Sequence, residues 1–190
     1  LAETHLVPSW GGGALGPVFV GWATNAAGKA GEVDAMSRAI AADPALAGWP
    51  GIGFVVQAYQ RRAPQVVDWI VDLARRHGHR LMVRLVKGAY WDSEIKRAQQ
   101  DGQSDYPVYT RKHHTDVSYL ACAQKLLAAP EAVYPQFATH NAHTLAAIVH
   151  MAQDLRGDYT PGQYEFQCLH GMGEPLYRQV VGPLQRPCRI

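Results

Sequence analysis

The feature that most limits how this chain can fold is a regular alternation of short apolar runs with helical segments, which begins near Gly51. The apolar runs have the length of buried strands and occupy residues 53–59, 81–86, 135–139 and 164–169, with a further strand starting at Cys188. The intervening segments predict helices over residues 65–77, 93–100, 116–127, 143–154 and 174–181. Buried strands joined by helical crossovers are typical of a parallel α/β sheet.

Residues 1–48 differ from the rest of the chain. They are rich in Gly and Ala and show weak periodicity, with a short strand predicted at Pro17–Trp22 and a helix at Glu32–Ala42. We therefore divide the chain into an aberrant or divergent N-terminal segment, 1–48, and a folded domain, 49–190.

Composition limits the class of protein. Hydrophobic residues make up 47% of the 190 residues, which excludes a disordered chain. The net charge of +2 does not favour nucleic acid as the main partner, and no apolar run reaches the roughly 18 residues of a membrane span. The scattered cysteines Cys122, Cys168 and Cys188 do not resemble a disulfide framework, so a reducing cytoplasm is expected.

Polar residues stand at or just beyond the carboxyl ends of the predicted strands: Gln57, Lys87, His140 and His170. In a (β/α) barrel this edge of the sheet carries the active site, and in an open doubly wound sheet it carries the ligand. The pattern predicts a site at this edge but leaves both architectures open.

Two segments suit a phosphate-bearing cofactor with rings. Arg84 to Trp91 combines two cations, a glycine and two aromatic residues; a solvated lysine with core aromatics is an equally good explanation of it. Thr110 to His114 is basic and precedes a helix, which is typical of a pyrophosphate-binding site. An ordinary basic loop explains the same pattern better.

A metal site is a separate alternative. The spacing of His140 and His143, with His170 nearby at another strand end, is compatible with a metal-dependent TIM-barrel hydrolase. No carboxylate stands in line with these histidines, and the cysteines lack CxxC spacing. The glycine-rich run after Gln167 fits either a loop against a ligand or a strand-to-helix turn.

Five longer segments, residues 51–60, 84–98, 106–112, 135–145 and 161–177, resemble the proline dehydrogenase domain of bacterial bifunctional proline utilization A. The resemblance implies a (β/α)8 TIM-like barrel, here incomplete with about five of eight strands recognisable. It also implies non-covalent FAD and oxidation of L-proline to Δ1-pyrroline-5-carboxylate by hydride transfer to flavin N5. A quinone acceptor at the membrane surface and a fused aldehyde dehydrogenase domain follow from it as partners. The expected location is cytoplasmic and peripheral to the inner membrane.

The resemblance also assigns roles to individual residues. It implies that Arg84 lies near flavin N5 as the catalytic residue, that Leu169 lines the proline pocket, and that no metal is required. It implies that FAD is bound by Gln57, Arg84, Val86, Lys87, Gly88, Ala89, Trp91, Thr110, Arg111, Lys112, Thr139, His140, Asn141 and Gln167.

The sequence departs from the family pattern at both ends. Glu32-Val-Asp34 is only weakly similar to the family's acidic motif. The chain stops at Ile190, before the family's last helix and its arginine pair. We therefore expect residues 49–190 to form a partial FAD-binding barrel, truncated before the last helix, with weak or no activity. A non-catalytic remnant remains the other alternative.

Overall fold

The computed structural model describes residues 18–20, 38, 43–44 and 51–190. Within them the strands form one parallel sheet with neighbours in chain order, β1 through β6. The strands are β1 (Val18–Val20), β2 (Ile52–Gln57), β3 (Leu81–Val86), β4 (Val133–Ala138), β5 (Glu165–Gln167) and β6 (Cys188–Arg189). A doubly wound sheet reverses its strand order at a switch point, whereas a (β/α) barrel keeps chain order. The sheet therefore has the order of a barrel.

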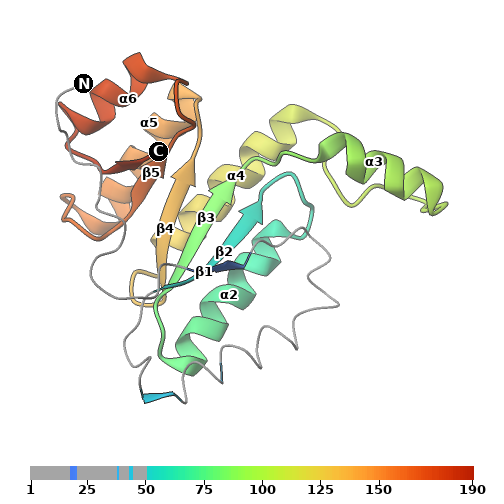
Figure 1. Cartoon of the computed structure of the whole chain (residues 1–190), viewed down its shortest axis with the longest axis horizontal. Coiled ribbons are helices and arrows are strands. Elements are labelled where there is room, and N and C mark those ends of the chain that lie inside the picture. Colours follow the sequence, from blue (N-terminus) through green and yellow to red (C-terminus); the bar gives the residue numbers. More distant parts are fainter. Residues whose placement is uncertain (1–17, 21–37, 39–42, 45–50) are drawn as a thin grey trace.

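The helices are α2 (Ala63–His77), α3 (Trp91–Gln100), α4 (Lys112–Leu127), α5 (Ala142–Arg156) and α6 (Glu174–Val181). α4 packs between α2 and α5 and contacts β3 and β4 (Figure 1). α3 extends to one side of the sheet in Figure 1, and Ala98 is its one buried residue. None of the helices in the described part of the chain has both the length and the apolar composition needed to cross a bilayer.

The strands present two different faces because successive side chains of a strand point to opposite sides. In β3, Leu81, Val83 and Leu85 join the hydrophobic core beneath the helices. Arg84 lies between the last two of these and belongs to the other, inner face, where polar side chains gather. The same alternation places Phe137 of β4 in the core.

The structure corrects several predicted boundaries. α4 begins at Lys112 rather than Asp116, and α3 begins at Trp91 rather than Ser93. The predicted start of α4 was wrong: an aspartate often lies at the start of a helix, but the Asp116 carboxylate lies within α4 and binds Lys87 and Lys112. β5 is limited to three residues, Glu165–Gln167, rather than six.

The N-terminal predictions are tested only in part. Val18–Val20 forms β1, inside the predicted strand, and pairs with β2. The predicted helix over 32–42, apart from Arg38, lies outside the described residues. The division of the chain at residue 48 stays a prediction.

Candidate active site

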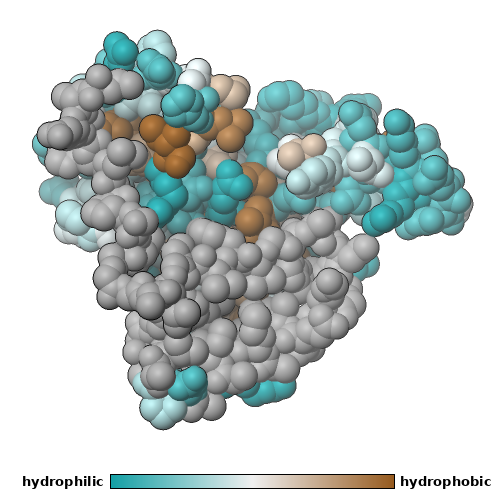
Figure 2. Space-filling model, in the orientation of Figure 1, coloured by the Kyte–Doolittle hydropathy of each residue, from teal (hydrophilic) through white to brown (hydrophobic). Residues whose placement is uncertain are grey.

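A cavity of about 760 Å³ opens at the carboxyl ends of β2, β3 and β4. Its described lining consists of Val55, Gln57, Arg84, Val86, Lys87, Gly88, Ala89, Tyr90, Lys112, Ala138, Thr139, His140, Asn141 and Leu169. Figure 2 shows apolar surface at the carboxyl ends of β3 and β4, beside the polar surface of α3. The cavity therefore lies at the edge of the sheet where the sequence predicts a site.

Arg84 is the cation on the inner face of β3. It is half-buried, and its Nε donates to Oε1 of Gln167 on β5 at 2.8 Å. The two residues are 83 positions apart in sequence. A guanidinium has several donors in a fixed plane, so fixing Nε also fixes the direction of the remaining N–H groups. Arg84 therefore presents an oriented cation to the cavity.

Between β2 and α3, the backbone at Gly88 and Ala89 packs against side chains of the segment that begins with β2. Gly88 has φ +135°, and a Cβ atom there would lie 2.3 Å from the Tyr59 ring. The backbone N–H of Ala89 donates to Oε1 of Gln57 at 3.2 Å. Glycine is needed at 88 both for this backbone conformation and for the contact.

Two lysines share one carboxylate at the rim of the cavity. Lys87 Nζ lies 2.6 Å from Asp116 Oδ1, and Lys112 Nζ lies 2.9 Å from Oδ2. Burial alone would raise the pKa of Asp116, but the two ammonium groups outweigh burial and hold that pKa below its ordinary value. The three side chains together carry a net charge of +1, and no carboxylate is among the described residues that line the cavity.

His140 and the turn after β5 hold each other in place. The backbone N–H of Leu169 donates to Nε2 of His140 at 3.1 Å, so this nitrogen acts as an acceptor. The Tyr177 hydroxyl of α6 donates to the carbonyl oxygens of Thr139 and Gln167, and burial raises its pKa. These contacts join the ends of β4 and β5.

Asn141 has a local structural role besides lining the cavity. Its Oδ1 accepts from the backbone N–H of Thr144 at 2.9 Å and caps the start of α5. An N-terminal cap of this kind typically stabilises a helix by about 1 kcal/mol.

Four predicted cofactor residues are absent from the described lining of the cavity. Trp91 begins α3 and donates its Nε1–H to the carbonyl oxygen of Tyr109. Thr110 and Arg111 are exposed at the start of α4. Gln167 is buried behind Arg84 and contacts it directly.

Three residues of the lining were not in the predicted set. Val55 and Ala138 belong to the inner faces of β2 and β4, and strand periodicity could have identified Val55 because it precedes Gln57 by two residues. Tyr90 lies in the segment 84–91, whose cations, glycine and aromatic residues suit a cofactor with rings, and it is 60% exposed.

The histidines of the metal alternative are not gathered into a site. His140 accepts a backbone hydrogen bond, and His143 lies in the first turn of α5. Across residues 51–190 and the short described stretches before them, no three His, Cys, Asp or Glu side chains are grouped closely enough to hold a metal ion. The geometry gives the hydrolase alternative no support.

Comparison with known proteins identifies relatives for most of the chain. The chain is 71% identical over 153 residues to the bifunctional protein PutA of Salmonella typhimurium and 70% identical over 153 residues to that of Escherichia coli. Each alignment covers 78% of this chain and 11% of the relative, so the chain spans about a ninth of their length.

Solved structures give a similar result. A mutant of proline utilization A from Bradyrhizobium japonicum matches with a TM-score of 0.78 and 49% identity, over 91% of this chain and 17% of that chain. The enzyme from Bdellovibrio bacteriovorus, inactivated by N-propargylglycine, matches with a TM-score of 0.79 and 34% identity over the same shares. These neighbours confirm the predicted fold class.

The family model of proline dehydrogenase matches residues 29–190. This match begins inside the segment 1–48 that the sequence analysis set apart, and it includes every residue that lines the cavity. The predicted resemblance is confirmed: the chain belongs to the proline dehydrogenase family.

Proposed function

We propose that this chain forms the FAD-binding part of a proline dehydrogenase that oxidises L-proline to Δ1-pyrroline-5-carboxylate. The observation that carries the proposal is that the cavity at the strand ends holds an oriented cation, Arg84. Two further cations, Lys87 and Lys112, line the same cavity, and both are ion-paired with Asp116. Membership of the family supports the same activity.

The residues present fit a flavin dinucleotide. A volume of about 760 Å³ lies in the upper part of the roughly 300–1,000 Å³ range of ligand cavities. Three cations and no carboxylate in the described lining suit an anionic ligand, and the apolar residues Val55, Val86 and Leu169 suit its rings. Gly88 is an exposed residue of the lining and contributes backbone groups to the wall of the cavity.

When bound, FAD supplies the hydride acceptor for the proline carbon next to nitrogen. The Arg84 guanidinium is held by Gln167 before any ligand arrives, so little reorganisation is needed for it to stabilise negative charge on the ring system. Lys87 and Lys112 would hold phosphate oxygens of FAD, and Asp116 keeps the two ammonium groups in place. Leu169 would supply an apolar contact for the proline ring.

The test measures FAD binding and reduction by L-proline without oxygen. The chain is expected to bind FAD. Because this partial domain is expected to have weak or no activity, its flavin absorbance is expected to fall slowly or not at all on addition of proline. Removing one charge-assisted contact, with Lys87→Met, is expected to weaken FAD binding about 10–100-fold, which corresponds to the roughly 1.5–3 kcal/mol of such a bond. Lys125→Met is the matched control, because Lys125 pairs with Asp68 and does not line the cavity.

Either of two results would refute the proposal. One is a chain that binds no FAD; the other is equal FAD affinity in the Lys87 and Lys125 variants.

We extend the proposal to the protein that contains this domain. Its relatives are named bifunctional, which supports a fused aldehyde dehydrogenase domain. We also propose that the protein transfers electrons to a quinone. We propose that it is cytoplasmic and peripheral to the inner membrane. The gene is expected to continue in frame into an aldehyde dehydrogenase sequence. Reduction of a soluble ubiquinone analogue by proline-treated protein tests the acceptor, and its absence would exclude it.

A further inference from the structure

A buried carboxylate lies behind the cavity, on the inner face of the sheet. Glu165 is the first residue of β5, is 0% exposed, and does not belong to the cavity lining. An ionised carboxylate in such a position requires several hydrogen-bond donors around it. The donors that surround it connect it to the candidate active site.

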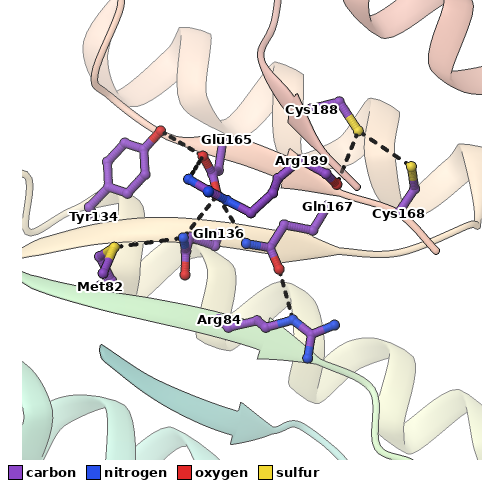
Figure 3. Close-up of polar contacts among 9 residues, drawn as sticks. All are labelled: Met82, Arg84, Tyr134, Gln136, Glu165, Gln167, Cys168, Cys188 and Arg189. Atoms are coloured by element: carbon purple, nitrogen blue, oxygen red, sulfur yellow. Dashed lines mark hydrogen bonds and ion pairs between the residues drawn. The ribbon is translucent and has the colours of Figure 1, made fainter. Parts of the chain in front are cut away.

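Side chains from three strands donate to this carboxylate (Figure 3). Arg189 of β6 donates through Nε to Oε1 at 2.8 Å and through Nη2 to Oε2 at 3.1 Å. Nε2 of Gln136 on β4 donates to Oε1 at 2.8 Å, and the Tyr134 hydroxyl donates to Oε2 at 3.3 Å. The carboxylate is therefore fixed in position independently of any ligand.

A further donor, the side-chain amide of Gln167, connects Glu165 to Arg84. Nε2 of Gln167 donates to Oε1 of Glu165 at 2.9 Å, while Oε1 of the same amide accepts from Arg84 Nε at 2.8 Å. An amide has its donor and its acceptor at opposite ends. If Gln167 turned over, its NH₂ group would face the Nε–H of Arg84, and its oxygen would face the Glu165 carboxylate. Glu165 thus decides which end of Gln167 meets Arg84.

We infer that Glu165 is a positioning residue for Arg84, acting through the side-chain amide of Gln167. The inference rests on the proposed function for its catalytic meaning, since that proposal places Arg84 beside the flavin. It gives Gln167 a role in addition to the predicted cofactor contact, because each end of its amide has a protein partner.

The first test needs no cofactor and uses the variant Glu165→Gln. Side-chain NMR of the ligand-free protein follows hydrogen exchange of the Arg84 Nε–H, identified by the loss of its signal in Arg84→Lys. We expect Glu165→Gln to speed this exchange at least ten-fold, because an amide at 165 no longer dictates the orientation of Gln167. Tyr134→Phe is the matched control: it removes one bond to Glu165 without touching Gln167, and exchange is expected to change less than two-fold.

A second variant covers the case in which Glu165→Gln does not fold. Gln167→Met keeps the length of the side chain, removes the amide, and leaves Glu165 with its donors from β4 and β6. It is also expected to speed the exchange at least ten-fold. Exchange within two-fold of the parent in the variant that folds would overturn the inference.

The second test uses the FAD-loaded protein and the midpoint potential of the flavin. Glu165→Gln is expected to shift the potential in the same direction as Arg84→Met, and to cause no further shift in the Arg84→Met background. An equal shift in both backgrounds would mean that Glu165 does not act through Arg84, which overturns the inference. A parent chain that binds no flavin would refute the proposed function alone, because the exchange measurement still decides the link from Glu165 to Arg84.

Discussion

Substituting Gly88 by alanine tests how tightly this residue of the cavity wall packs against the Tyr59 ring. The added methyl would lie 2.3, 2.5 and 2.6 Å from three ring carbons of Tyr59, which is 3% exposed and cannot move freely. The backbone at 88, with φ +135°, also disfavours any residue with a side chain. Both effects destabilise the folded chain, and they add to each other.

The expected magnitude follows from these two costs. A side chain in a sparsely populated backbone region costs about 1–3 kcal/mol, and overpacking a well-filled site costs about 1–3 kcal/mol. The less flexible unfolded chain of the variant recovers about 0.4–1 kcal/mol. The net loss of about 1–5.6 kcal/mol lowers Tm by roughly 2–22 °C for a chain of this size.

The assay is urea and thermal unfolding followed by circular dichroism, with Gly78→Ala as the matched control. Gly78 also has a positive φ, +67°, but nothing lies within 4 Å of the position that an added methyl group would take there. It should therefore lose only the backbone cost, about 1 kcal/mol. If Gly88→Ala loses no more stability than Gly78→Ala, the contact with Tyr59 is not as close as the structure has it, and the reasoning fails.

Three further predictions concern the core, the cavity rim and the cysteines. Phe137→Ala, at a fully buried ring, is expected to lower the free energy of unfolding by about 3–5 kcal/mol in urea titrations, and a loss below about 1 kcal/mol would contradict the packing described. The lowered pKa of Asp116 implies that its ion pairs stabilise the fold above pH 3.8 and that this contribution disappears as pH falls through the lowered pKa. Asp116→Asn should therefore show a smaller loss of stability under acid, and an unchanged pH profile would argue against the ion pairs. Iodoacetamide should modify the half-buried Cys168 before Cys122 or Cys188, as followed by mass spectrometry. The reason is that burial raises the pKa of Cys122 to about 11 and also raises the pKa of Cys188. Modification of Cys122 before Cys168 would refute this order.

The sequence by itself determined the kinds of elements and much of the site. Apolar runs bounded by turn residues identify the strands, because burial on both faces of a parallel sheet demands continuous hydrophobicity. Arg84 and Lys87 were recognisable because a charge at the end of an apolar strand is costly unless it serves a partner or a ligand. The cavity lining includes both of them, together with Gln57 and His140.

Only the tertiary structure decided how these elements meet. The order of the strands depends on long-range pairing, and local sequence does not encode whether a parallel sheet keeps or reverses its order. The hydrogen bond from Arg84 to Gln167 joins residues 83 positions apart. Glu165, whose carboxylate orients the Gln167 amide, looks in the sequence like any polar residue of a short strand. The sequence could place each of these side chains on a strand, but the register between strands brings them within hydrogen-bonding distance.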